Sequence, residues 1–174
     1  MVTVSPSGNT TTTVTYTPIQ TQTISGSSTT SVTFSSVPGT YKDLVVVMSV
    51  APNAAGSNFE LTFNSDTGNN YSRTSLSGNG TSASSSRESS YSSFRFLSTS
   101  NTANLFSLAT LQIMNYANTT TYKSLINRNN QDGGSDVGVQ VGLWRNTAAI
   151  TTVTLTHGNA LRAGSTFTLY GIGA

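Results

Sequence analysis

The chain has 174 residues, a length that suits one β-sandwich domain, and charged residues make up only 8% of it, with Ser, Thr, Asn and Gly in their place. A formal net charge of +2 provides no basic field for binding nucleic acid or an anionic membrane surface. The lack of cysteine excludes disulfides and thiolate metal sites, and the longest apolar run, residues 44–48, is far too short to span a bilayer.

The N-terminal segment carries little hydrophobic patterning. We therefore predict that residues 1–9 form a flexible or docking arm and that residues 10–174 form a single domain. The first six residues have neither the basic start nor the apolar stretch of a signal peptide. We expect the protein to fold in a reducing cytosol.

Short β-branched and aromatic segments, separated by Gly, Pro and Asn turns, recur along the rest of the chain and predict strands. In residues 59–63 the two Phe and the Leu share one face, and residues 43–50 lack alternation, which predicts burial on both faces. No segment has a sustained helical period, so we expect an all-β fold, a single antiparallel β-sandwich or jelly-roll-like domain. Strands are predicted at residues 10–22, 31–34, 43–50, 59–63, 94–97, 108–116, 122–126, 137–143, 150–155 and 166–171.

Two polar stretches are predicted to be loops. Residues 74–93, rich in Ser and Gly, read as a long exposed loop, whose part 77–93 should be the most mobile region of the free subunit. Residues 127–135 read as a polar hairpin loop.

The sequence contains no convincing catalytic constellation. His157, the single histidine, lies in a Thr-His-Gly-Asn turn and is expected to be a solvated loop residue rather than a general base. Asp132 and Asp136 flank two glycines and a serine, which could wrap calcium, although Asp-Gly-Gly is also a common hairpin turn. We favour the turn, and predict neither an enzyme nor a cofactor.

Aromatic and arginine side chains are the candidates for contact with a ligand or a partner chain. Aromatic rings can stack on sugars, but they more often pack at core edges, and Trp144 at a strand end is expected in the core. Arginine is enriched at protein interfaces. The candidates for sugar stacking are Tyr71, Tyr91, Tyr116, Tyr122 and Trp144, and the expected interface residues are Arg73, Arg87, Tyr91, Arg95 and Tyr116.

Four blocks follow one another from residue 31 to the C-terminus: residues 31–44, residues 63–66 with 70–72, residues 142–151 and residues 164–172. Together they resemble a family of small virion proteins of tailed phages, frequent in phages of aquatic bacteria, including cyanophages. Their Pro-Gly and Gly positions suit turns and close backbone approach, which is typical of a fold signature rather than a site. The resemblance implies a role on the virion surface.

We therefore expect a non-enzymatic structural protein on the exterior of a phage particle, a capsid decoration, cement or head-appendage subunit. Its expected partners are other virion proteins, such as the major capsid protein or tail and portal components. We also expect it to associate with copies of itself, with a trimer as the favoured oligomeric state. The alternative is a tail fibre or receptor-binding tip that recognises host surface polysaccharide. A glycan-degrading enzyme ranks third.

Overall fold

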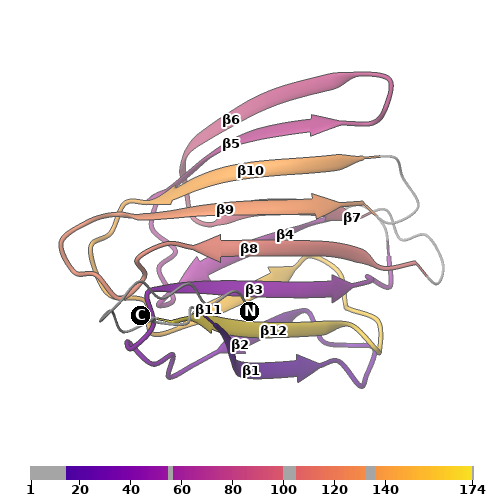
Figure 1. The fold of residues 1–174 in the computed structure, drawn as a ribbon. Helices are drawn as coiled ribbons and strands as arrows, with labels where there is room; N and C mark the ends of the chain where they lie inside the picture. Colours follow the sequence, from indigo (N-terminus) through magenta and orange to yellow (C-terminus); the bar gives the residue numbers. More distant parts are fainter. Residues whose placement is uncertain (1–14, 55–56, 100–104, 132–135, 174) are drawn as a thin grey trace, which may run out of the picture.

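The structure, a computed structural model, describes residues 15–54, 57–99, 105–131 and 136–173. These residues form twelve β-strands and no helix, arranged as two antiparallel sheets that pack face to face (Figure 1). The described part of the chain thus contains no helix that is long and apolar enough to cross a membrane. The expected all-β sandwich is confirmed, and the predicted arm, residues 1–9, lies outside the described residues.

The larger sheet has eight strands and the smaller sheet has four. In spatial order the larger sheet consists of β1 (Tyr16–Thr23), β12 (Thr166–Ile172), β3 (Asp43–Val50), β8 (Ser107–Ile113), β9 (Lys123–Asn130), β10 (Val137–Trp144), β5 (Tyr71–Gly78) and β6 (Ala83–Tyr91). The smaller sheet consists of β2 (Ser31–Phe34), β11 (Val153–His157), β4 (Ser57–Phe63) and β7 (Phe94–Thr99).

The core lies between the two sheets and follows the predicted alternation. Phe59, Leu61 and Phe63 of β4 are fully buried, as predicted. Each such buried side chain stabilises the fold by roughly 1.5–3 kcal/mol relative to an exposed one. In β3 the prediction of burial on both faces holds for Val45 but is wrong for Val47, which is 42% exposed on the outer face.

The prediction of a long loop over residues 74–93 is wrong, because most of this stretch belongs to the hairpin of β5 and β6. Asn79 closes the turn by accepting hydrogen bonds from the backbone N–H groups of Thr81 and Ser82, at 3.0 and 2.8 Å. β6 pairs only with β5, at the edge of the larger sheet. Neither face of β6 is buried, so the sequence carries no apolar alternation to reveal it.

The ends of β9 and β10 also differ from the sequence prediction. Residues 127–130, predicted as loop, continue β9, with Asn127 buried between the sheets. In β10 the valines face outward, and Gly138, Gln140 and Gly142 face inward. A Cβ atom on Gly142 would lie 2.3 Å from the ring of Phe94, so the close approach of β7 requires glycine there.

A half-buried polar cluster ties the second and third resemblance blocks together. The Asp66 carboxylate accepts hydrogen bonds from Trp144 Nε1 at 2.8 Å and Asn70 Nδ2 at 2.9 Å. Tyr71 donates to the Asp66 carbonyl and accepts from the Phe63 N–H at 2.9 Å. Trp144 is fully buried, as expected, so these blocks hold strand ends in place.

Candidate functional site

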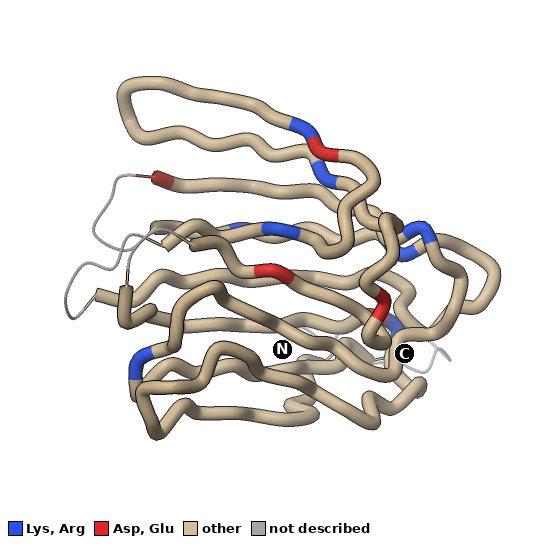
Figure 2. Tube along the Cα trace, turned by 180° about the vertical axis from the view of Figure 1, so that it is seen from behind, with Lys and Arg blue, Asp and Glu red and all other residues tan. Residues whose placement is uncertain are grey.

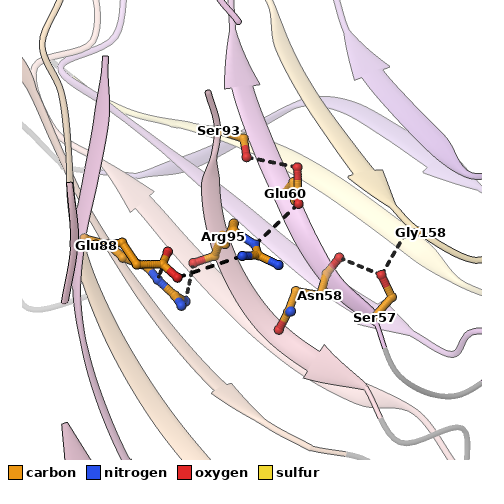
Figure 3. Close-up of polar contacts among 8 residues, drawn as sticks. Ser57, Asn58, Glu60, Glu88, Ser93, Arg95 and Gly158 are labelled. Atoms are coloured by element: carbon orange, nitrogen blue, oxygen red, sulfur yellow. Dashed lines mark hydrogen bonds and ion pairs between the residues drawn. The ribbon is translucent and has the colours of Figure 1, made fainter. Parts of the chain in front are cut away.

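The charged residues of the chain lie mostly apart from one another, with one cluster beside the β5–β6 hairpin (Figure 2). Arg73 Nε donates a hydrogen bond to Glu88 Oε2 at 2.8 Å, and Arg73 Nη1 donates to the Arg95 carbonyl at 2.8 Å. Arg95 in turn lies 3.4 Å from Glu60 and 3.9 Å from Glu88 (Figure 3). Ser93 donates to the other Glu60 oxygen at 2.9 Å.

This cluster, here called the ion-pair cluster (Arg73, Glu88, Arg95 and Glu60), joins the two sheets. Its arginines come from β5 and β7, and its acids from β6 and β4. With two positive and two negative side chains it is neutral, and each arginine already has an acidic partner. The cluster therefore holds the hairpin against the smaller sheet rather than offering a free charge to a ligand.

The expected interface residues do not come together as one surface. Arg73 and Arg95 belong to the ion-pair cluster, Arg87 is exposed on β6, and Tyr91 is 38% exposed at the end of that strand. Tyr116 is fully buried and donates to the Pro38 carbonyl, so its place among the expected contact residues is corrected. Burial raises the pKa of its hydroxyl.

Two of the remaining candidates for sugar stacking are also core residues. Tyr71 and Trp144 are fully buried, with their rings stacked at a centroid distance of 6.4 Å. Burial raises the pKa of Tyr71 well above its usual range. Tyr122 is 54% exposed, in the segment before β9. Of the five candidates for sugar stacking, Tyr91 and Tyr122 are the exposed ones.

His157 is not the solvated loop residue that was expected. It ends β11 with 1% of its surface exposed, and its ring lies 4.8 Å from that of Phe59. Nε2 lies 3.1 Å from the Thr99 hydroxyl, and Nδ1 accepts from the Asn159 N–H at 3.1 Å. Turn-like neighbours conceal this burial in the sequence, and both nitrogens have structural partners.

The metal candidate falls partly outside the described residues. Asp132 is not described, and the backbone carbonyl of Asp136 accepts a hydrogen bond from the Gln131 N–H at 3.0 Å, as expected at a hairpin. Among the residues that the structure does describe, no group of three or more His, Asp or Glu side chains could hold a metal ion.

A polar groove of about 330 Å³ opens between the two sheets, next to the ion-pair cluster. Amide and hydroxyl side chains line it where a sandwich would normally have core, among them Asn58, Ser75 and Gln140. Beneath it, Asn127 Nδ2 donates to Gln140 Oε1 at 2.5 Å, while Asn127 Oδ1 is buried without a hydrogen-bond partner. We call this hollow the inner groove.

The outer face of the larger sheet carries an apolar surface that the sequence prediction did not identify as exposed. Its centre, here called the outer patch, consists of Leu76 on β5 and of Val137, Val139 and Val141 on β10, which are 36–59% exposed. Val139 pairs with Leu76 on one side and with Arg128 of β9 on the other.

The alternation of the valines was visible in the sequence, but not the face on which they lie. Glycines on the opposite face are the available signal, because they allow the close packing seen at Gly142. Leu108 of β8 and Val47 of β3 are also exposed on this face, separated from the outer patch by β9 with Arg128.

Comparison with known proteins does not place the chain in a family. No family model matches the sequence, and no curated protein matches it. Among solved structures, the galectin LEC-6 of Caenorhabditis elegans is similar over 88% of this chain and 96% of its own, at 12% identity and a TM-score of 0.36. A likeness this distant carries no argument about activity, and the functional conclusions depend on the geometry of the chain.

Proposed function

We propose that this chain is a non-enzymatic structural subunit on the exterior of a tailed-phage particle, a capsid decoration, cement or head-appendage protein. The resemblance of the four sequence blocks to virion proteins supports this, and the outer patch is the observation that carries it. Soluble monomers rarely expose contiguous apolar patches larger than a few hundred Å². The outer patch places four exposed apolar side chains side by side on the larger sheet, and such a surface is suited to being covered by protein.

A structural rather than catalytic role is supported by what the titratable groups contact. The ring nitrogens of His157 are taken up by Thr99 and Asn159. Glu60 and Glu88 are ion-paired, and Asp66 is hydrogen-bonded to Trp144. A general base needs a free lone pair within reach of substrate, and these groups are already used in holding the fold.

The proposed location is the assembled virion, with the major capsid protein or tail and portal components as neighbours. Quantitative mass spectrometry of purified particles tests this. A copy number in fixed proportion to the major capsid protein is the expected result. A few copies per particle would move the subunit to the tail, and the lack of the chain from purified particles would overturn the proposal.

A second candidate is recognition of host surface polysaccharide, and the inner groove is the observation that favours it. Its amides and hydroxyls can exchange hydrogen bonds with a neutral sugar, and the ion-pair cluster leaves it without a free arginine that would demand an anion. Under this proposal Gln140→Ala weakens binding of purified host polysaccharide at least about tenfold, since a buried hydrogen-bonded group is lost.

Calorimetric titration measures this effect, with Ser85→Ala on the far face of the sheet as the matched control. Equal affinities of the two variants, or no binding by the unsubstituted chain, would exclude the inner groove as a sugar site.

A further inference from the structure

We propose that the outer patch is the interface of a twofold dimer, in which a second copy of this chain packs its own outer patch against the first. This inference rests on the proposed structural role and names the partner of one surface. It replaces a trimer with a dimer, because one flat face that packs on itself closes with two copies.

The outer patch contains both halves of a self-complementary contact. Leu76 protrudes with 57% of its surface exposed. Beside it lies an apolar hollow of about 580 Å³, lined by Ala83, Val137, Val139 and Leu76 itself. A twofold contact is reciprocal, so that every contact is made twice with the two copies exchanged. The Leu76 of each copy can therefore enter the hollow of the other.

The register of the strands indicates where the twofold axis lies. Ser85, Leu76, Val139 and Arg128 form one row across β6, β5, β10 and β9. An axis between β5 and β10 sets each Leu76 against the Val139 of the other copy. The same axis sets each Arg128 against the Ser85 of the other copy.

Two arginines flank the apolar contact on this face. Arg128 is the one charged residue that lines the hollow, and Arg87 is exposed on the same face, two residues from Ser85 on β6. The inferred axis keeps the two Arg128 side chains apart and sets each against the Ser85 hydroxyl of the other copy, with Arg87 of that copy close by. These like charges oppose the association that the apolar contact favours, and an acidic side chain at position 85 would relieve them.

The available area reaches the lower limit for a specific interface. Strands β9, β10, β5 and β6 lie side by side (Figure 1) and have eight or nine residues each. These four strands overlap about an axis between β5 and β10, because β6 is the edge of the sheet, and at the usual strand spacing and rise they cover about 19 Å by 27 Å, or on the order of 500 Å² per copy. The two copies together then bury on the order of 1,000 Å².

Sedimentation velocity on the full chain tests the interface. We expect a species of twice 18.2 kDa at micromolar concentration. Val139→Glu should raise the dissociation constant at least about 100-fold, because it replaces an apolar side chain at the centre of the contact by a carboxylate that faces Leu76 of the other copy. Tyr122→Glu adds the same charge at an exposed aromatic residue outside the outer patch and should change nothing.

A second pair of variants tests the register. Ser85→Glu should tighten the dimer roughly fivefold at low salt, since it faces Arg128 of the other copy, and the gain should fall at high salt. Ser86→Glu is the matched control, because Ser86 is the next residue of β6, its side chain points to the opposite face, and it does not line the hollow. Circular dichroism of all four variants checks that they fold.

A chain that stays monomeric at about 100 μM, a trimer, or a Val139→Glu variant that remains dimeric would overturn the inference. Equal effects of Ser85→Glu and Ser86→Glu would overturn the register. These measurements use the isolated chain, so a monomer that is nevertheless present on particles refutes the dimer alone. A dimer that is missing from particles refutes the proposed function alone.

Discussion

Asp66 shows how single residues of the resemblance blocks stabilise the strand ends. Burial raises the pKa of its carboxyl, but the hydrogen bonds from Asn70, Trp144 and Gly68 outweigh this and lower the pKa overall. Trp144 lies between this carboxylate and the ring of Phe63, at a centroid distance of 5.3 Å. The burial of Trp144 could be predicted from the sequence, because the residue lies at the end of a strand. Its hydrogen bond to Asp66 could not be predicted, because the two residues lie 78 positions apart in the sequence and only the fold brings them together.

Trp144→Ala should lower the free energy of unfolding by about 3–5 kcal/mol, because a fully buried ring is replaced by a cavity. Trp144→Phe keeps most of the packing and loses the hydrogen bond to Asp66, so a smaller loss of about 1–3 kcal/mol is expected. Urea denaturation measures both. A loss below about 1 kcal/mol for the alanine variant would place the ring outside the core.

Asp66 should also make stability depend on pH. Its pKa is lower in the folded state, so its contribution is complete above the unfolded value of about 3.9 and is lost as the pH falls through the folded value. The stability difference between the unsubstituted chain and Asp66→Asn should therefore be largest at pH 7 and shrink toward about pH 3. Urea midpoints at both pH values test this, with Asp136→Asn as a control outside the cluster. A constant difference would contradict the account.

At the scale of elements, the strands with apolar alternation were predicted, and the Ser-rich hairpin of β5 and β6 was missed. β2 and β3 were predicted with the bounds that the structure gives, because their apolar residues face the core. β6 has a Ser-rich sequence with no buried face, and it forms because its backbone pairs with β5. The inner groove was not predictable either, since Asn127 and Gln140 meet across two strands.

The close contact of β10 with β7 leads to a prediction at Gly142. Gly142→Ala should destabilise the chain by about 1–3 kcal/mol, because the added Cβ would lie 2.3 Å from the ring of Phe94. Gly26→Ala is the matched control, since no atom lies within 4 Å of a Cβ atom there. Thermal unfolding of the two variants distinguishes them, and equal melting temperatures would contradict the close packing.

The hairpin of β5 and β6 remains the region where we expect the most motion in the free subunit. β6 has hydrogen-bond partners on one side only and no buried face. Its amides should therefore exchange with deuterium faster than those of β3, which pairs on both sides and contributes to the core. Protection of β6 equal to that of β3 in the monomeric Val139→Glu variant would refute this expectation.

At the scale of the whole molecule, the two sheets differ in what they leave exposed. The larger sheet extends beyond the smaller one at the β5–β6 hairpin, with the inner groove on one face there and the outer patch on the other. Few charged side chains protect its edges against association. Under the proposed function, these features serve a subunit that is completed by its neighbours, and this is its central claim.

Cryo-electron microscopy of purified particles tests that claim most directly, because it shows both where the chain lies and which face is covered. The account predicts many copies on the particle exterior, with the outer patch of each copy buried against protein, Val139 at the centre of the contact. Copies whose outer patch faces solvent, or particles without the chain, would contradict it.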